Sequence, residues 1–419
     1  MNDTPAGKLT PLDESLVSSH FAGRRCLVTG GLGFIGSNLA LALSTGGAEV
    51  TVVDALVPTH GGDRGNLDDA AGPIDVIDAQ VDDVGLVRDA AARSEVIFNL
   101  AGQVSHVESM ARPRFDLEVN TASQLGFLEI LRDVGSKAVV VYTSTRQIFG
   151  HPRYLPVDEE HPVSPVDVNG INKWAAEQLH RLYAELYGIR ASSVRLTNVY
   201  GPRQRLRDDL QGFLPIFIRR ALSDEPITVF GDGAQERDCL YVDDVVECLL
   251  LTAGSAEAPG EVFNVGNDEH LSLRAIAEAI VVAAGSGSVE SVPWPHDRDA
   301  IDIGEDRCCA RRAHRGRRRH GRERRHDDLV ARADADGPQR QAQRLGPRRD
   351  RDRVAPATER GELGLEGFGL RAEQEPPGAH DPVDGRAEIG LQGSRAARQI
   401  DHGRPGRHRR HRYRERCDR

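Results

Sequence analysis

The sequence predicts an α/β fold of the Rossmann type, in which a doubly wound parallel sheet is followed by a smaller mixed α/β substrate lobe. Three observations predict it: short β-branched runs alternate with helical segments, a glycine-rich turn follows the first run, and an acidic residue ends the second. The helical segments include 36–47, 116–135 and 170–188. Buried parallel strands form continuous apolar runs, and the runs expected as strands are 25–30, 49–54, 95–102, 138–144 and 190–201.

The first turn, "VTGGLGFIGSN" at 28–38, places Gly30, Gly33 and Gly36 after a strand and at the start of a helix. One glycine permits the tight turn, one lets a pyrophosphate approach the backbone, and one lets helix and strand pack closely. The helix N-terminus then faces the phosphates. Asp54 ends the second strand, where its carboxylate can bind a ribose 2′-hydroxyl and repels a 2′-phosphate. The pattern therefore predicts NAD as the cofactor, in preference to NADP.

After position 201 the order of elements becomes mixed, with two helical patterns and two short strand-like runs. We therefore expect residues 24–201 to form the NAD-binding Rossmann domain and 202–304 to form a substrate-binding lobe. Residues 1–23 are polar and are expected to be a flexible leader. The helical patterns after position 201 cover 210–224 and 242–254, and the strand-like runs cover 227–230 and 261–266.

The segment 305–419 differs in composition from everything before it. With 30 arginines and 20 acidic residues it carries a net charge of +10, which leaves −20 for the first 304 residues. It has neither a strand nor a helix period and little apolar surface, so disorder is expected. Its abrupt start favours an out-of-frame translation over a genuine arginine-rich arm for RNA or another anionic partner. The acidic body gives no indication of nucleic-acid binding.

The six cysteines have neither metal-ligand spacing nor a disulfide framework, so no metal site is expected. No apolar run approaches the roughly 18 residues of a membrane span. The first 23 residues lack the apolar core of a signal peptide. These observations predict a cytoplasmic protein that does not bind a membrane.

Five motifs follow one another along residues 24–304: the Gly-x-x-Gly-x-x-Gly turn, "NLAGQVS", "YTST", "NGINK" and "RDCLYVDDVV". In type and order they resemble those of the extended short-chain dehydrogenases/reductases, the NAD-dependent epimerase/dehydratase family. The resemblance implies a tightly held NAD and a nucleotide-sugar substrate whose hydroxyl is oxidised and reduced again, and a homodimer is expected. It implies cofactor contacts, beside the three glycines and Asp54, at Phe34, Ile35, Gln80, Val81, Leu100, Ala101, Gly102 and Lys173.

The catalytic motif departs from the family at one position. In the family a tyrosine phenolate is the base, a lysine four residues later lowers its pKa, and a Ser/Thr holds the hydroxyl. Thr145 and Lys173 match, but Asn169 stands where the tyrosine is expected. An amide can orient a hydroxyl but cannot accept a proton near neutral pH. Another group must take the proton, and Tyr142, His151 and a water on Asn169 are candidates.

A second departure concerns the reaction class. Thr145 is followed by Arg146 and Gln147, where sugar 4,6-dehydratases of the family have Asp-Glu and related decarboxylases tend to have Glu second. Neither residue can serve as the acid or base that eliminates water. The resemblance therefore favours an NAD-dependent nucleotide-sugar epimerase similar to UDP-glucose 4-epimerase. The alternatives are a dehydrogenase, reductase or 4,6-dehydratase of the same family, or a silent binding protein that lacks the tyrosine.

The resemblance places the sugar nucleotide at Asn198, Arg237, Arg298 and Asp302. Two arginines suit a diphosphate because each guanidinium can bind two oxygens. His106, like His151, borders the predicted cleft. We interpret both as ordinary loop histidines, with a substitute base as the alternative.

We expect the purified protein to bind NAD(H) more tightly than NADP(H) by roughly tenfold or more, the ratio that about 1.4 kcal/mol of charge repulsion produces. Asp54→Ala should reduce this preference because it removes the carboxylate that repels the 2′-phosphate. Calorimetric titration of both proteins with both cofactors measures it. Equal affinities in the wild-type protein would contradict the role of Asp54.

Overall fold

The computed structural model of the protein describes residues 14–58, 60–207, 212–267 and 271–294. Its centre is a seven-stranded sheet in the order β11-β6-β5-β4-β1-β2-β3, and every neighbouring pair is parallel. The doubly wound sheet predicted from the sequence is confirmed. β3 is an additional strand at one edge, and the strand-like run expected at 261–266 forms β11 at the other edge. The strands are β1 (Arg25–Thr29), β2 (Glu49–Asp54), β3 (Ile74–Asp78), β4 (Val96–Asn99), β5 (Val139–Thr145), β6 (Arg190–Leu196) and β11 (Val262–Val265).

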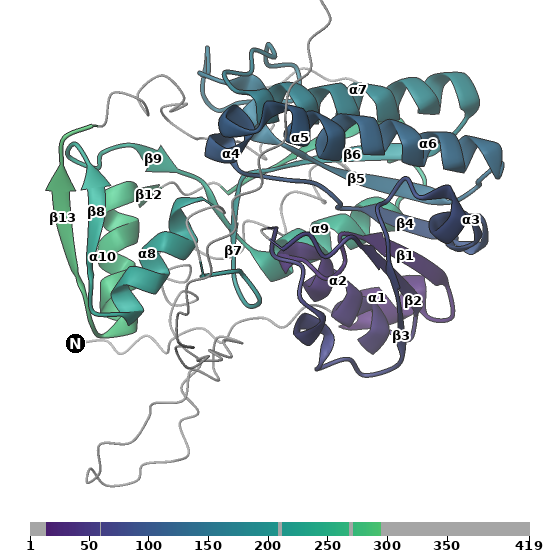
Figure 1. The fold of residues 1–419 in the computed structure, drawn as a ribbon, viewed down its shortest axis with the longest axis horizontal. Coiled ribbons are helices and arrows are strands. Elements are labelled where there is room, and N and C mark those ends of the chain that lie inside the picture. The colour runs from purple at the N-terminus through teal and green to yellow at the C-terminus, as the bar shows by residue number, and fades with distance from the viewer. Residues whose placement is uncertain (1–13, 59, 208–211, 268–270, 295–419) are drawn as a thin grey trace, which may run out of the picture. The chain divides into compact units, whose positions relative to one another are not determined.

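Helices cover both faces of this sheet (Figure 1). Successive strand residues point to opposite faces, so Val28 of β1 packs with the first group of helices and Leu27 with the second. The two apolar clusters bury the two faces of the sheet. The first group is α1 (Glu14–Phe21), α2 (Phe34–Thr45) and α9 (Val242–Gly254); the second is α3 (Val84–Arg93), α6 (Ser123–Asp133) and α7 (Val168–Tyr187).

Helix α1 corrects the expectation of a flexible leader over residues 1–23. Val17 and Phe21, four residues apart on one helix face, are 1% and 0% exposed. The ring of Phe21 lies 6.2 Å from that of Phe98 in β4, centroid to centroid. The leader prediction is therefore wrong for residues 14–21, because the buried Val17 and Phe21 anchor a short helix on the sheet.

The expected lobe, 202–304, does not form one unit with its own core. Its helix α9 packs in the apolar cluster of the first group, and its strand β11 pairs with β6, with Phe263 opposite Val194. A parallel β6–β11 pair needs a helical crossover, and α9 supplies it. Residues 242–265 therefore belong to the Rossmann domain, and the predicted domain boundary at 201/202 is wrong for them.

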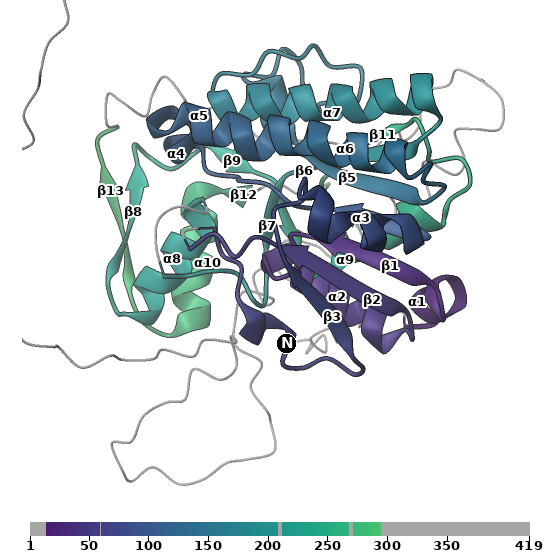
Figure 2. The ribbon, with the colours of Figure 1, turned by 45° about the vertical axis from the view of Figure 1, so that its right-hand side comes forward.

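The remaining part of the expected lobe has its own apolar cluster, formed by α8 (Phe213–Leu222), α10 (Leu273–Ala284) and the parallel pair β8 (Pro226–Phe230) and β13 (Ser288–Val292). Figure 2 shows these four elements together beyond the carboxyl ends of the central strands. Two further pairs join this part to the sheet: β7 (Asn198–Tyr200) with β10 (Cys239–Tyr241), and β9 (Glu236–Arg237) with β12 (Leu271–Ser272). Arg298, Asp302 and the expected tail 305–419 lie outside the described residues.

Short helices complete the site. α4 (His106–Ala111), α5 (Pro113–Leu117) and the π-helix η2 (Glu118–Ala122) lead from β4 into α6, and the 3-10 helix η3 (Arg146–Phe149) follows β5; η1 (Arg64–Leu67) lies between β2 and β3. Asp167 caps α7, where its Oδ1 accepts from the Gly170 N–H at 2.7 Å. Among the helices that the structure describes, none combines the length and the apolar character that crossing a membrane requires.

Candidate functional site

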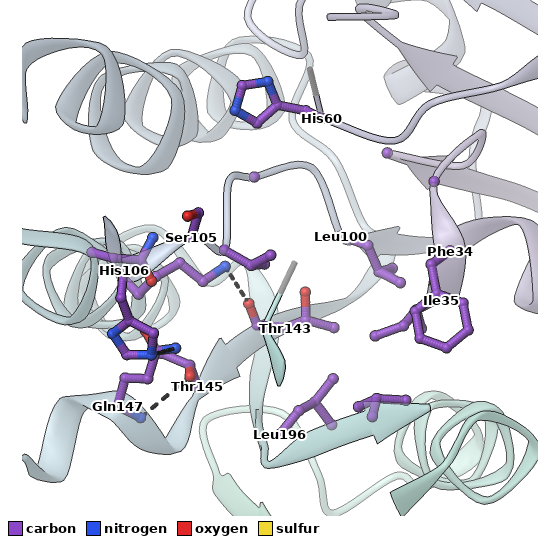
Figure 3. A pocket seen from close by; sticks show the side chains of 18 of the residues that line it. Phe34, Ile35, His60, Leu100, Ser105, His106, Thr143, Thr145, Gln147 and Leu196 are labelled. Atoms are coloured by element: carbon purple, nitrogen blue, oxygen red, sulfur yellow. Dashed lines mark hydrogen bonds between the residues drawn. The ribbon is translucent and has the colours of Figure 1, made fainter. Parts of the chain in front are cut away.

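A cavity of about 540 Å³ opens at the carboxyl ends of β1, β2, β4 and β5. This volume is within the range of small-ligand pockets, and the position matches the point where strand order reverses in a doubly wound sheet. In Figure 3, Phe34, Ile35 and Leu100 lie on one side of the cavity. Thr145 and His106 lie on the opposite side, so the cavity joins the glycine-rich turn to the residues expected to be catalytic.

The glycine-rich turn has the geometry that its sequence predicts. Gly30 has a φ of +66°, a conformation that side-chain-bearing residues rarely adopt. A Cβ on Gly36 would lie 2.2 Å from the Gly30 carbonyl oxygen, so only glycine lets α2 begin against this turn. Gly33 is the N-cap residue of α2 and lines the cavity. The first turn of α2 therefore presents its backbone N–H groups to a ligand there.

Asp54 lies at the end of β2 and lines the same cavity. Its Oδ2 accepts from the Leu32 N–H at 3.1 Å and its Oδ1 from the Leu56 N–H at 2.9 Å. Burial raises the pKa of Asp54, against the effect of these two N–H groups, which lower it. Each carboxyl oxygen keeps a second lone pair, so the anchored group can still bind ribose hydroxyls.

The other residues expected to contact the cofactor line the cavity as well. Gly102 has a specific steric role there: a Cβ would lie 2.8 Å from Asn120 Oδ1 and 3.4 Å from Lys173 Nζ. A larger residue would push against the lysine. The lining positions expected from the sequence and found here are Gly30, Gly33, Phe34, Ile35, Gly36, Asp54, Gln80, Val81, Leu100, Ala101, Gly102 and Lys173.

Lys173 is buried on the inner face of α7 and reaches the cavity floor. Its Nζ donates to the Thr143 carbonyl at 2.8 Å and lies 4.8 Å from the centroid of the Tyr142 ring. Burial lowers the pKa of Lys173 to about 8, although the negative charges of Asp116 and Glu177 oppose the change. The ammonium is therefore more easily deprotonated than an exposed lysine.

Asn169 is 1% exposed and belongs to a buried polar network. Its amide nitrogen donates to the Gln103 carbonyl at 2.9 Å and to Asp116 Oδ2 at 3.0 Å. One helical turn later, Asn172 donates to Asp116 Oδ1 at 2.8 Å. Asn169 borders the cavity, but its donors are directed into the protein. The expectation that this amide positions a substrate hydroxyl or a water thus gains no support from its hydrogen bonds.

On the opposite wall, Thr145, Gln147 and His106 lie side by side (Figure 3). Thr145 Oγ1 accepts from the Gln147 backbone N–H at 3.2 Å, which leaves its hydroxyl proton available. The Gln147 side-chain amide contacts His106 Nε2, and His106 Nδ1 in turn contacts the Asp167 carboxylate. Thr145, Gln147 and His106 therefore follow one another along the wall, and the buried Asp167 lies behind His106.

The candidate bases Tyr142 and His151 do not reach the site. The Tyr142 ring is fully buried and stacked on His180, with centroids 4.2 Å apart, and burial raises the Tyr142 pKa well above its ordinary value. His151 is exposed. Neither residue is among those that line the cavity, so neither interpretation as the base is supported. His106, treated from the sequence as an ordinary loop histidine, does line it.

At the far end of the cavity, Asn198 and Arg237 line the wall, as expected for substrate-binding residues. The Asn198 amide donates to the Asp238 carbonyl at 2.9 Å, and Arg237 is 8% exposed. Sequence reasoning did not name Asp116 or Asp167. Asp167 had a readable signal, since an acidic residue immediately before a helix is a typical N-cap. Asp116 had none, because its partners come from a helix more than 50 residues away.

Comparison with known proteins agrees with this geometry. The sequence profile of the NAD dependent epimerase/dehydratase family matches residues 26–266. The chain belongs to the NAD dependent epimerase/dehydratase family. The matched segment begins in β1 and ends just after β11, so it contains the seven strands of the central sheet.

Individual relatives of this family place it among nucleotide-sugar enzymes. A UDP-glucose 4-epimerase of Mycolicibacterium smegmatis is 36% identical over 62% of this chain and 83% of its own length. A putative UDP-glucose 4-epimerase of Methanocaldococcus jannaschii is 32% identical over 61% and 80%. The solved UDP-glucose 4-epimerase of Thermus thermophilus in complex with NAD is 31% identical, covers 68% and 90%, and has a TM-score of 0.59. Other relatives are named as decarboxylases or dehydratases of nucleotide sugars.

The residues of the site fit the cofactor that gives the family its name. The first turn of α2 and the cradle at Gly33 suit a pyrophosphate, and Asp54 has lone pairs available for ribose hydroxyls. Gly102 and Lys173 would border the nicotinamide ribose, because Gly102 leaves the lysine room to approach. NAD is therefore the cofactor that these residues would hold.

Lys173→Met should stabilise the folded protein by about 1–3 kcal/mol at pH 7, because a pKa lowered from 10.5 to about 8 means that folding disfavours the ammonium. Below pH 8 the lysine is charged in both the folded and the unfolded state, so the difference in free energy of unfolding between Lys173→Met and the wild type is constant. Between pH 8 and 10.5 only the unfolded state keeps the proton. The wild type therefore gains stability with rising pH, and its difference from the variant narrows. Denaturant unfolding at several pH values measures it.

The exposed Lys137→Met is the matched control for a general effect of replacing lysine by methionine. A stability difference between the wild type and Lys173→Met that did not narrow above pH 8 would contradict the lowered pKa.

Proposed function

We propose that the protein is an NAD-dependent nucleotide-sugar epimerase similar to UDP-glucose 4-epimerase. The observation that carries the proposal is a single cavity lined by the glycine-rich turn at Gly33, by Asp54, and by Thr145 and Lys173. The residue at position 147 is a glutamine and carries no carboxyl group. The names of the M. smegmatis and M. jannaschii relatives support the same reaction.

The side chains have distinct roles in this proposal. When bound, NAD supplies the oxidising equivalent that converts a sugar hydroxyl to a ketone and the reducing equivalent that restores it. Thr145 holds the hydroxyl through its free hydroxyl proton. Lys173 binds the cofactor ribose and adds positive charge beneath the reacting groups. Arg237 binds the diphosphate, where a guanidinium can contact two oxygens. Arg298 and Asp302 remain predictions from the sequence.

A 4,6-dehydratase or a decarboxylase is the nearest alternative, since relatives with those activities exist. Gln147 opposes it. Its amide contacts His106, and an amide cannot supply the carboxylic acid chemistry expected at that position. A silent binding protein is the second alternative, suggested by Asn169. His106 on the cavity wall, paired with the buried Asp167, argues against it, because the imidazole provides another proton acceptor.

We also propose that two copies associate through the surface of α5, α6 and α7. Large apolar side chains on that surface are exposed, and those of α7 recur on one helical face. A second copy would remove them from water, and sedimentation analysis would detect the dimer. The exposed apolar residues are Leu117, Leu125, Ile171, Trp174, Leu182 and Leu186.

The location in the cytoplasm stays a prediction from the sequence.

Incubation with NAD and UDP-glucose, UDP-galactose or their N-acetylated counterparts should interconvert one such pair without net reduction of NAD. Product analysis by chromatography should reveal no 4-keto-6-deoxy sugar, and a separate incubation with UDP-glucuronate should release no carbon dioxide. Lys173→Met should abolish turnover. Binding of a nucleotide sugar by the wild type without any conversion would instead support the silent binding protein.

A further inference from the structure

We infer that His106, held by Asp167, is the group that accepts and returns the proton of the sugar hydroxyl. The inference rests on the proposed epimerase function and supplies the base that Asn169 cannot be. It moves the proton chemistry from α7, where the family motif has its tyrosine, to the first residue of α4.

His106 is fixed from the side opposite the cavity. Its Nδ1 contacts Asp167 Oδ2, and the other oxygen of the same carboxylate caps α7 through the Gly170 N–H at 2.7 Å. The Asp167 side chain is 1% exposed, whereas that of His106 is 31% exposed and reaches the cavity. A carboxylate on Nδ1 stabilises the tautomer with the proton at that nitrogen. It also stabilises the imidazolium that forms when Nε2 takes a second proton.

Nε2 of His106 faces Gln147, and Gln147 is tied to Thr145. In the neutral state the Gln147 amide nitrogen donates to the Nε2 lone pair. The Gln147 Oε1 is buried and has no hydrogen-bond partner within the described part of the chain. If the amide turns by half a rotation, this oxygen accepts from a protonated Nε2. The Gln147 side chain can therefore pair with either protonation state of His106. When substrate is bound, a hydroxyl held by Thr145 can replace the Gln147 amide at Nε2.

The burial of the acid is compensated by this arrangement. Burial alone would raise the pKa of Asp167, but the hydrogen bond and charge of His106 and the N–H groups of Gly170 and Asn169 lower it below its ordinary value. The carboxylate thus remains charged at neutral pH and able to pair with an imidazolium. A neutral acid would hold the ring but would not stabilise its charge.

The other ionisable groups around the dyad have partners elsewhere. On α4, Glu108 pairs with His60 and Arg112, and on α5, Asp116 is held by two asparagines. Lys173 on α7 donates to the Thr143 carbonyl. On η3, Arg146 is a permanent cation that cannot accept a proton.

The ionisable groups elsewhere on the cavity wall are not suited to the role. Asp54 lies at the end of β2 with both oxygens bound to backbone N–H groups, and Arg237 cannot accept a proton. His60 is also paired with a carboxylate, that of Glu108 at 3.1 Å, but in Figure 3 it lies at the end of the view away from Thr145. Lys173, with a pKa of about 8, is mostly charged at pH 7.

The proton balance closes within the site. As the hydroxyl is oxidised, its O–H bond breaks and an N–H bond forms at Nε2 of His106. The imidazolium is then paired with Asp167 while the ketone is present. When the ketone is reduced, the N–H bond breaks and the proton returns to the same oxygen, so the histidine ends the turnover neutral.

The test compares His106→Gln, Asp167→Asn and the wild type in the full chain. His106→Gln should lower kcat/KM for epimerisation by about 10²–10³-fold, within the range of general acid–base catalysis. Asp167→Asn keeps a capping oxygen for α7 and removes only the charge, so a smaller loss is expected. NAD affinity and melting temperature, measured alongside, should change little.

His151→Gln is the matched control, because it makes the same change at an exposed histidine outside the cavity wall and should retain wild-type activity. The ¹⁵N spectrum of the ring provides a readout independent of turnover. In the wild type it should show the proton of neutral His106 on Nδ1, and Asp167→Asn should weaken that preference.

The two proposals fail in different ways. An active wild type with His106→Gln within about twofold of its rate, or with the proton of neutral His106 on Nε2, would overturn the role of His106 alone. A wild type that turns over no nucleotide sugar would overturn the epimerase function, and the proton role with it.

Discussion

The carboxylate of Asp116 is the constraint on which the catalytic wall depends. It has no exposed surface, and an uncompensated buried charge would cost several kcal/mol. Asn169 and Asn172, one turn apart on α7, each donate to one of its oxygens. These bonds tie α5 to α7 and use the position where the family motif has a tyrosine. The same charge favours the ammonium of Lys173, so the lysine is supported by a fixed acid.

This arrangement separates two tasks that the family motif combines. In our proposal Lys173 provides the positive charge beside the reacting groups. The neighbouring Glu177 is paired with Arg195 through bonds of 2.6 and 3.0 Å. Proton transfer, in our proposal, is carried out by His106, which Asp167 holds at the N-terminus of the same helix, α7. Asp167 also caps α7. One residue therefore both begins the helix that carries Lys173 and orients His106.

Local sequence patterns predicted the parts of this molecule that local physics determines. The turn at Gly30 and Gly36 and the acid at Asp54 could be predicted because each is required within one βα unit. Long-range placement could not. The position of α9 on the Rossmann sheet depends on β11 pairing with β6, about 70 residues away in sequence, and the short helix α1 is held by contacts such as that of Phe21 with Phe98. Asn169 could be identified as a departure from the motif, but its partner Asp116 became visible only in the fold.

In our interpretation Asn169 is a working member of a buried network and is no remnant of a lost tyrosine. The most direct measurement is the stability and turnover of Asn169→Tyr, compared with the wild type. A phenol ring must fit where the side chain is 1% exposed, and Asp116 loses one of its two amide donors. Both the melting temperature and the rate of nucleotide-sugar conversion should fall. A variant that melts with the wild type and turns over about 10²-fold faster, as a restored general base would, would contradict the account.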